Sequence, residues 1–214
     1  MYSFLMKNRK KSHTGRPKGS GLPSRALTEK EINRLRTVLH GSRRNRERNI
    51  ALVELALGTG CRINELCSLK IGDVMLRDKI KKEFVLGKTK NGSSHRVFMS
   101  KAAHKALTQY LEYVFLDKPR TKKESPLFPS QKNGFMSPSS GSRLIVSLLD
   151  KAGIDKAGGA HALRKSFSRA LYSQSGGNLK LLQKCLNHRH LSSTSVYLSA
   201  SAAEIGEAVE QLKL

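Results

Sequence analysis

Apolar residues recur at helical spacing along several separate stretches of the chain. Ile32, Leu35 and Leu39 follow the capping-box pattern Thr28-Glu29-Lys30-Glu31, so the first helix is predicted to begin there. The same criteria predict further helices over residues 50–57, 63–69, 102–116, 138–149, 161–172, 179–186 and 202–212. Helices therefore make up most of the expected fold.

Between residues 70 and 100 the periodicity changes to that of short strands. Residues 74–76, 83–86 and 96–99 are β-type runs, and Asn91-Gly92 is a strong hairpin signal between the last two. We therefore expect a small three-stranded antiparallel sheet beside the helices, which makes the fold class α+β.

The two ends of the chain differ from its middle. Residues 1–26 are basic and contain few candidate core residues, so we expect a flexible N-terminal arm. Residues 27–200 hold the periodic segments and form the predicted folded domain. Residues 201–214 carry an apolar stripe at i, i+4 and i+7, which packs either on the chain's own core or on a neighbouring protomer.

The charge of the chain indicates a polyanionic partner. Forty Lys and Arg residues against 16 Asp and Glu give the 214 residues a formal net charge of +24. Double-stranded DNA is the leading candidate, and a membrane surface is the second, although no segment is long and apolar enough to span a bilayer. Because the N-terminus shows no signal-peptide pattern, we expect a cytoplasmic, nucleoid-associated protein. A ribosomal or histone-like protein without chemistry would carry a similar charge.

The sequence offers little to hold a metal ion. Its three cysteines are odd in number and lack paired spacing, which favours free thiols in a reducing cytoplasm. Cys185, His188 and His190 have the spacing of half a zinc site, but no second pair of ligands stands at a matching distance. Acidic residues are few and do not cluster. We therefore expect no metal and no cofactor.

A group of cationic and phenolic residues is suited to attack on a DNA phosphodiester. The transition state carries charge on the nonbridging oxygens, which Arg stabilises best because its guanidinium grips two oxygens at once. His161 and Arg164 stand three apart on one helix face, His188 follows, and Tyr197 lies nine residues beyond His188. A phenol has an ordinary pKa of about 10, so it needs cationic neighbours to react at neutral pH.

Further cations stand upstream. Arg62 directly follows the glycine turn at residues 58–60, and Glu65 lies three residues on, within reach of the Arg62 guanidinium. Pairing with Glu65 is compatible with phosphate binding. Lys90 precedes the Asn91-Gly92 turn, where it is either a solvated hairpin lysine or a proton donor.

Six residues, taken in this order, resemble the signature of the tyrosine recombinase (phage integrase) family: Arg62, Lys90, His161, Arg164, His188 and Tyr197. The matching stretches are 60–69, 87–92, 161–164 and 186–188, with the tyrosine nine residues further on. The resemblance covers about residues 26 to 200, and it implies the mainly helical catalytic domain of that family.

The resemblance also implies a role for each residue. The two arginines would clamp the scissile phosphate, and Lys90 would protonate the leaving 5′-oxygen. His161 would assist removal of the tyrosine proton, and His188 would hydrogen-bond the phosphate. Tyr197 would attack, giving a 3′-phosphotyrosine link and a free 5′-hydroxyl. The ester keeps the bond energy, so no nucleotide cofactor is needed.

Three of these assignments have rivals. Lys88, His190 and Tyr172 compete for the roles of general acid, second imidazole and nucleophile. The family register, counted back from Val97, favours Lys90 over Lys88. The Leu-Asn-His context favours the histidine that follows Asn187, and the nine-residue spacing from that histidine favours the later tyrosine.

The chain departs from the family pattern at two positions and at its front. Asn187 stands where a glycine is common, and Lys165 stands where a histidine often follows the second arginine; neither removes a catalytic group. About 26 basic residues occupy the place of the usual helical core-binding domain of about a hundred residues. The fimbrial-switch invertases are short relatives of the same kind, and the catalytic motifs also resemble those of Xer-type recombinases.

The missing front domain bears on how DNA is held. The resemblance implies a homotetramer on two DNA sites, in which the C-terminal helix docks into a neighbouring protomer. The basic arm, or an accessory DNA-binding protein, would supply the front clamp. Residues expected to contact DNA away from the reacting phosphate are Arg16 and Lys18 in the arm, Arg43, Arg44 and Arg46 in a basic turn, and Lys88 in the hairpin. In the arm, a Gly-Arg-Pro element can lay its Arg into an AT-rich minor groove, although a generic basic arm would look similar.

The predicted function is therefore site-specific DNA recombination, of the kind used by mobile genetic elements for integration, resolution or inversion. A type IB topoisomerase-like enzyme uses similar chemistry on one duplex and would not require two sites. A basic DNA-binding regulator that has lost catalysis is a second alternative, against which the intact set of six residues argues. A metal-dependent nuclease is a third, and EDTA would inhibit only that one.

Overall fold

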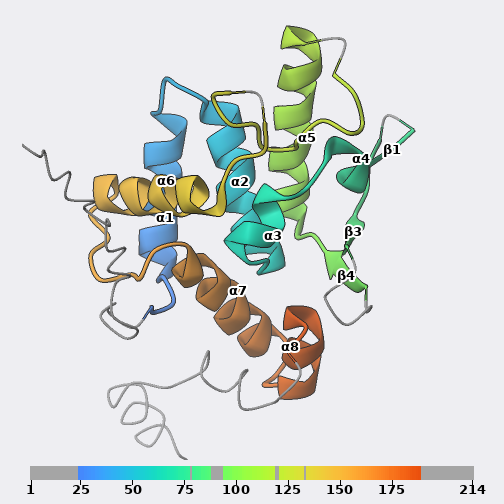
Figure 1. The fold of residues 1–214 in the computed structure, drawn as a ribbon. Helices are drawn as coiled ribbons and strands as arrows, with labels where there is room; N and C mark the ends of the chain where they lie inside the picture. Colours follow the sequence, from blue (N-terminus) through green and yellow to red (C-terminus); the bar gives the residue numbers. More distant parts are fainter. Residues whose placement is uncertain (1–23, 78, 88–93, 119–120, 133, 189–214) are drawn as a thin grey trace, which may run out of the picture.

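The computed structural model describes residues 24–77, 79–87, 94–118, 121–132 and 134–188. These residues form a mainly helical domain with two short β-ladders (Figure 1). The elements follow in the order α1 (Glu29–His40), α2 (Arg46–Thr59), α3 (Ile63–Cys67), α4 (Ile71–Val74), β1 (Met75–Leu76), β2 (Lys79–Ile80), β3 (Glu83–Leu86), β4 (His95–Phe98), α5 (Lys101–Asp117), α6 (Pro138–Lys151), α7 (Ala160–Gln174) and α8 (Leu179–Leu186). The predicted fold class is confirmed.

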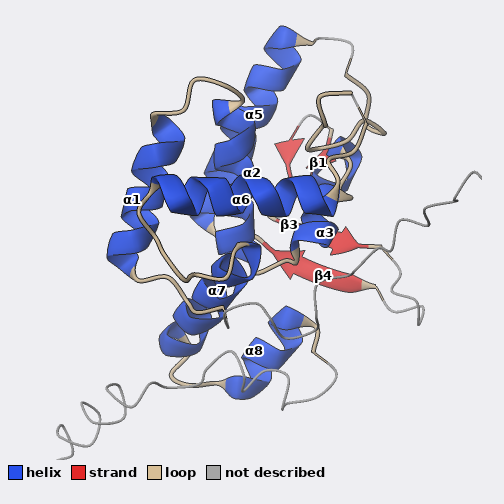
Figure 2. Cartoon of the chain, turned by 60° about the vertical axis from the view of Figure 1, so that its left-hand side comes forward, coloured by secondary structure: helices blue, strands red, loops and turns tan. Residues whose placement is uncertain are grey.

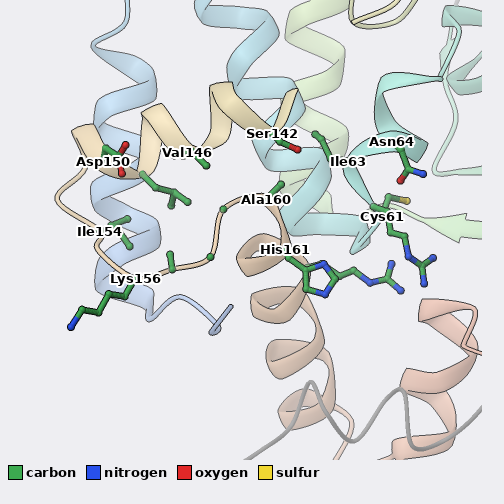
Figure 3. Close-up of a pocket in the computed structure, with 16 residues that line it drawn as sticks. Cys61, Ile63, Asn64, Ser142, Val146, Asp150, Ile154, Lys156, Ala160 and His161 are labelled. Carbon is green, nitrogen blue, oxygen red and sulfur yellow. The ribbon is translucent and has the colours of Figure 1, made fainter. Parts of the chain in front are cut away.

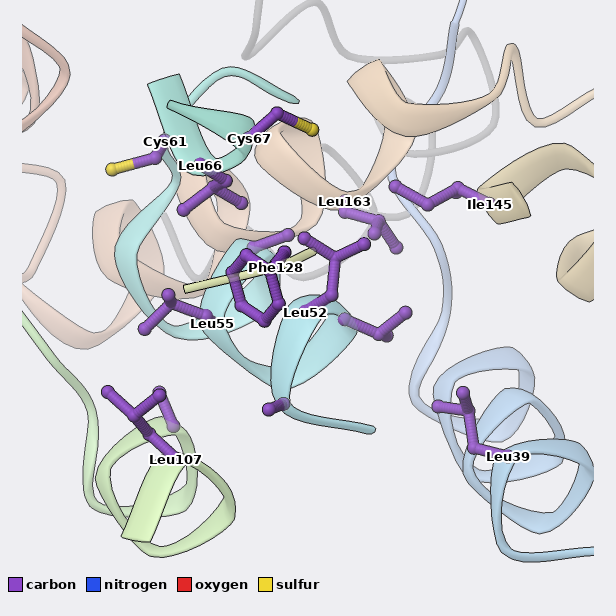
Figure 4. Packing of buried hydrophobic residues seen from close by; sticks show 14 of the residues in the cluster. Leu39, Leu52, Leu55, Cys61, Leu66, Cys67, Leu107, Phe128, Ile145 and Leu163 are labelled. Atoms are coloured by element: carbon purple, nitrogen blue, oxygen red, sulfur yellow. The ribbon is translucent and has the colours of Figure 1, made fainter. Parts of the chain in front are cut away.

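Helix α2 is the centre of the domain. Its sequence carries apolar residues on every side, and a helix of that kind is stable only when it is surrounded. Helices α5, α7 and α1 pack against it, and α6 crosses α1 (Figure 2). Leu52 and Leu55 of α2 are fully buried and lie among Phe128, Leu107 and Leu163 from other parts of the chain (Figure 4). The end of α2 is thereby fixed in the interior, which matters because the site begins there.

The starts of α1 and α6 follow the predicted capping signals. The Thr28 hydroxyl accepts a hydrogen bond from the backbone N–H of Glu31, and the Glu31 carboxylate accepts one from the backbone N–H of Thr28, which confirms the capping box. Ser137 caps α6 with Pro138 at the first helical position. The predicted boundaries of α8 are those observed.

The predicted three-stranded sheet is wrong in its details. The structure has two separate antiparallel ladders, one of β1 with β2 and one of β3 with β4. Residue 74 belongs to the short helix α4 rather than to a strand. The backbone N–H of Lys81 donates to the Val74 carbonyl, and the Lys81 ammonium donates to the carbonyls of Gly72 and Asp73. The chain therefore turns back onto α4 between β2 and β3, and a continuous sheet does not form.

The segment before α1 anchors the start of α7, which carries part of the site. The backbone N–H of Leu27 donates to the Ser166 hydroxyl at 2.8 Å, and the backbone N–H of Arg25 donates to the Ala157 carbonyl at 3.2 Å. The Arg25 guanidinium also forms a two-pronged ion pair with Glu31. Among the helices that the structure describes, none is long and apolar enough to cross a membrane.

Candidate active site

The site begins where α2 ends. Gly60 caps the helix with φ +67°, a left-handed conformation that costs glycine little. A Cβ atom at this position would lie 2.3 Å from the Phe167 ring, so α7 approaches the turn as closely as a glycine allows. From this turn the chain passes through Cys61, which is buried in the core, to Arg62, which reaches the surface.

Arg62 stands at the N-cap of α3 and is held by Glu65. The Glu65 carboxylate accepts from the Arg62 backbone N–H at 2.6 Å and from its guanidinium at 3.1 Å, as the sequence spacing predicted. The Arg62 side chain is 42% exposed. The guanidinium is therefore oriented by an acid and still open to a ligand from solvent.

Arg164 is the buried counterpart of Arg62. It lies on the second turn of α7, and only 3% of its surface is exposed. Its guanidinium donates to the Gly60 carbonyl at the end of α2 and, at 2.9 Å, to the Leu186 carbonyl at the end of α8. A single cation thus joins the ends of two helices, whose carbonyls carry partial negative charge.

His188 follows α8 and contacts the same guanidinium. Its Nε2 lies 2.9 Å from Nη2 of Arg164. Because a guanidinium can only donate, Nε2 must accept, and the neutral ring then carries its proton on Nδ1. Asn187 makes the approach possible by adopting φ +51° as the C-cap of α8, a conformation that asparagine tolerates. Burial, together with the nearby positive charges of Arg164 and Arg62, lowers the pKa of His188 to about 4.

His161 lies on the first turn of α7. Burial lowers its pKa below the ordinary value, with added repulsion from the positive charges of Arg164, Lys165 and Arg62. His161 is nevertheless exposed to solvent, so its ring is open to a ligand. Both histidines of the site are therefore neutral at pH 7 and can accept a proton or share one.

A pocket of about 680 Å³ opens beside these residues (Figure 3). His161, Arg62 and Arg164 line one end of it. Its other walls come from α6, through Val146 and Asp150, and from the loop before α7. The site is thus an open depression with two arginines at one end and Lys156 toward the other, which suits an extended anionic ligand better than an enclosed small molecule.

The structure brings together four of the six predicted catalytic residues: Arg62, His161, Arg164 and His188. The two others, Lys90 and Tyr197, lie outside the described residues. Lys88, the rival of Lys90, and His190, the rival of His188, also lie outside them, as do the predicted arm residues Arg16 and Lys18. The rival Tyr172 is described, on α7 and eight residues beyond Arg164.

The basic turn predicted to contact DNA lies away from this cluster. Arg43, Arg44 and Arg46 stand between α1 and the start of α2, at the opposite end of α2 from Arg62. A helix of this length places them about 20 Å from that end. All three are exposed, and Arg46 pairs with Glu47 at 2.9 Å. Their predicted role therefore concerns a different part of any bound duplex.

Sequence reasoning missed the groups that hold the cluster together. They are the backbone carbonyls of Gly60 and Leu186 and the side chain of His95, whose Nε2 lies 3.2 Å from the Cys185 carbonyl of α8. Carbonyl groups have no sequence signal. The only feature of the sequence that could have pointed to His95 is its spacing of two residues from Val97, which places both side chains on the inner face of β4.

The cysteines form no disulfide in the described part of the chain, and burial makes Cys61 and Cys67 unreactive. Desolvation raises the pKa of Cys61 to about 12 and that of Cys67 to about 11. The described residues contain no group of three or more His, Cys, Asp or Glu side chains that could hold a metal ion.

Comparisons with known proteins point to one family. The sequence model described as phage integrase family matches residues 25–204. A tyrosine recombinase XerC of Bacillus pumilus is 33% identical over 178 residues, which is 82% of this chain and 57% of that protein. A tyrosine recombinase XerA of Pyrococcus horikoshii is 28% identical over 198 residues, which is 89% of this chain and 62% of that protein.

Solved structures agree with the sequence comparisons. The crystal structure of a XerA recombinase superposes with a TM-score of 0.72 at 28% identity, covering 90% of this chain and 67% of that one. A XerH site-specific recombinase bound to difH substrate gives a TM-score of 0.66 at 25% identity, covering 89% and 55%. This chain spans about three fifths of the length of the curated relatives it matches.

Proposed function

The chain belongs to the phage integrase family, and on this basis we propose that it is a site-specific DNA recombinase that cuts and rejoins strands through Tyr197. One observation carries the proposal. Arg62 and Arg164 converge with two neutral imidazoles around one open position, and all four come from the motifs of the family signature.

The scissile phosphate is proposed to bind between the two arginines. Arg62, held by Glu65 and open to solvent, supplies the outer part of the clamp. Arg164 supplies the inner part from a fixed position, because two backbone carbonyls and His188 hold its guanidinium. Cations that are already in place lower the barrier, since they need no rearrangement as charge develops on the nonbridging oxygens.

Proton transfers are assigned to the remaining residues. The Tyr197 hydroxyl attacks phosphorus, and its proton passes to His161, which is neutral and can accept it. The P–O5′ bond breaks, and Lys90 donates a proton to the leaving 5′-oxygen. The products are a 3′-phosphotyrosine and a free 5′-hydroxyl. Rejoining is the same reaction with a new 5′-hydroxyl as nucleophile, so it needs no nucleotide cofactor.

Double-stranded DNA is the proposed partner. Its support is the net charge of +24 and the relatives whose structures were determined on DNA, among them XerH with its difH substrate. We further propose a homotetramer on two DNA sites, with residues 201–214 docking on a neighbouring protomer. The basic arm and an accessory DNA-binding protein are proposed to add contacts with DNA, and the proposed place of action is the DNA of the nucleoid.

A suicide substrate tests the nucleophile. A duplex with a nick next to the cleavage position loses its short 5′-hydroxyl fragment after cleavage, so the covalent adduct accumulates and is resolved on a denaturing gel. The wild-type chain is expected to form a 3′-linked adduct, and Tyr197→Phe is expected to form none, since phenylalanine has no hydroxyl.

Tyr172→Phe is the matched control, because Tyr172 is the rival tyrosine on α7 and the same atom is removed. It should form the adduct as the wild type does. An adduct that persists in Tyr197→Phe and disappears in Tyr172→Phe would reverse the assignment. No adduct in the wild type, on DNA bearing its own sites, would contradict the proposed reaction.

The relatives found are recombinases and integrases, which favours recombination over a topoisomerase-like activity or binding without catalysis. Assays on plasmids with no, one or two target sites distinguish these activities. Recombination requires two sites and yields rearranged circles, whereas a topoisomerase relaxes a plasmid that has no site.

A further inference from the structure

The last turn of α8 has a complete set of hydrogen-bond partners, and two of them come from distant parts of the chain. A helix leaves its last four carbonyls without intrahelical donors. The first two, of Gln183 and Lys184, accept from the backbone N–H groups of His188 and Asn187, both at 3.1 Å. These bonds are the local cap formed by the left-handed Asn187.

The last two carbonyls are capped by side chains. The Leu186 carbonyl accepts from Arg164 at 2.9 Å, and the Cys185 carbonyl lies 3.2 Å from Nε2 of His95. Because a carbonyl can only accept, Nε2 of His95 carries a proton. Strand β4 therefore donates to the end of α8 across a separation of 90 residues.

We propose that His95 is a positioning residue, which fixes the end of α8 from the β3–β4 hairpin and so holds His188 against Arg164. His188 stands two residues beyond the last helical residue, so any shift of this end moves the imidazole. This inference rests on the proposed function for its meaning in catalysis.

The place of His95 in its strand supports the proposal. Its partner in the ladder is Leu86, and it shares the inner face of β4 with Val97, which is 3% exposed. The backbone of His95 is thus fixed by the ladder and by the core, and its half-buried ring reaches α8, which lies next to β4 in both views (Figure 1, Figure 2). A donor fixed in this way can set the position of its acceptor, as supports around a functional group generally do.

Few side chains nearby could replace His95 as the donor to the Cys185 carbonyl. Lys184 and Lys180 on α8 are exposed and Arg96 points to the opposite face of β4, where it pairs with Glu83 at 3.0 Å. The nearest charged groups that act on the His95 ring are Glu65, Arg164 and Arg62, which belong to the phosphate site itself. His95 therefore stands at the edge of the site without being one of its assigned catalytic residues.

Three substitutions separate donation from packing. His95→Leu fills similar space without a donor. His95→Gln places an amide N–H about where Nε2 lies, whereas His95→Asn places it nearer the Nδ1 position and is too short to reach the carbonyl. In single-turnover cleavage of the suicide duplex, His95→Leu and His95→Asn are expected to be slower than the wild type by about tenfold, and His95→Gln by no more than about twofold.

A double-mutant cycle shows whether His95 acts through His188. If it does, His95→Leu in a His188→Ala background should change the cleavage rate by less than about twofold, because the group it positions is already absent. A full tenfold loss in that background would overturn the proposal, as would a His95→Gln variant as slow as His95→Leu or a His95→Leu variant as fast as the wild type.

A measurement without DNA keeps the inference separate from the proposed function. The pKa of His188 can be followed by NMR of the imidazole resonances. It should rise toward its ordinary value in His95→Leu, because the ring moves away from Arg164, and stay low in His95→Gln. If wild-type cleavage fails but this contrast is seen, the proposed function is wrong and the positioning role stands. If cleavage occurs but the pKa of His188 is the same in all variants, the positioning role is wrong.

Discussion

Arg164 is buried, although the role proposed for it requires N–H groups that can reach a phosphate. Its guanidinium has five N–H donors, and those that contact the Gly60 and Leu186 carbonyls keep its plane in one orientation. Arg62 differs, because its side chain is 42% exposed and is oriented by one acid. The two arginines of the site therefore depend on the fold to different degrees.

Replacing each arginine with lysine should show this difference. Arg164→Lys keeps the charge but cannot hold two carbonyls in a fork, and we expect the free energy of unfolding to fall by about 3 kcal/mol. Arg62→Lys should lower it by less than about 1 kcal/mol. Urea denaturation followed by circular dichroism measures both. Equal losses in the two variants would contradict the structural role of Arg164.

The low pKa of His188 predicts how stability changes with pH. Its value in the folded protein is about 4, below the ordinary 6.5, so the unfolded chain binds the proton first as the pH falls. The contribution of His188 is therefore complete above pH 6.5 and is lost as the pH falls from 6.5 to about 4. After screening by solvent we expect a loss of about 1 kcal/mol. Urea unfolding at several pH values, compared with His188→Asn, measures it; an equally steep dependence in that variant would assign the effect elsewhere.

At the scale of elements, the turn between α2 and α3 is the most sensitive point. Gly60 combines φ +67° with a Cβ position 2.3 Å from Phe167, so Gly60→Ala adds both backbone strain and a clash with α7. We expect a loss of about 2 to 4 kcal/mol of unfolding free energy and slower cleavage, since Arg62 and the carbonyl that binds Arg164 both move.

Gly87→Ala is the control for that variant. Gly87 follows β3, is exposed, and has open space where its Cβ would stand. Its unfolding midpoint in urea should stay within experimental error of the wild type. A Gly60→Ala variant that is equally stable would show that α7 adjusts at no cost.

The helices were largely predictable, and the small elements were not. Capping signals at Thr28 and Ser137 and long apolar stripes fix α1 and α6, because these signals act over neighbouring residues. Helix α4 has four residues, fewer than the periodicity needs to show itself, and the contacts that hold it come from the loop at residues 121–126. The strands are equally short, and for the same reason the sequence did not show that they form two separate ladders rather than one sheet.

The candidate site was predictable where its residues form motifs. Arg62, His161, Arg164 and His188 were singled out because their motifs resemble the family signature, and the structure places these four residues together. His95 was not found, because its importance comes only from a contact with α8, 90 residues away. Geometry of that kind depends on how elements pack, which the sequence pattern alone does not determine.

For the whole molecule, the net charge of +24 predicts that DNA binding weakens steeply with salt. Residues 1–23 contain only basic charges: Lys7, Arg9, Lys10, Lys11, Arg16 and Lys18. Replacing all six with glutamine should lower the slope of log K against log salt by as much as about 5, if each contacts a phosphate. Fluorescence anisotropy of a labelled duplex over a range of KCl concentrations measures the slope.

The matched control neutralises the same kind of charge elsewhere. Replacing Arg43, Arg44 and Arg46 with glutamine removes three exposed cations at the far end of α2 and should lower the slope by at most about 3. An unchanged slope in the arm variant would mean that the arm does not contact DNA.

The hydrogen bonds by which Arg164 joins the ends of α2 and α8 also limit which substitutions this sequence can accept during evolution. A lineage that no longer needs strand exchange but keeps the protein for binding DNA can lose the nucleophile or Arg62 at little cost to folding. It cannot lose Arg164 as freely, because the Gly60 and Leu186 carbonyls would both lose the side chain that donates to them. Descendants of this chain that lack the proposed activity are therefore expected to retain Arg164 even where Arg62 or Tyr197 has been replaced.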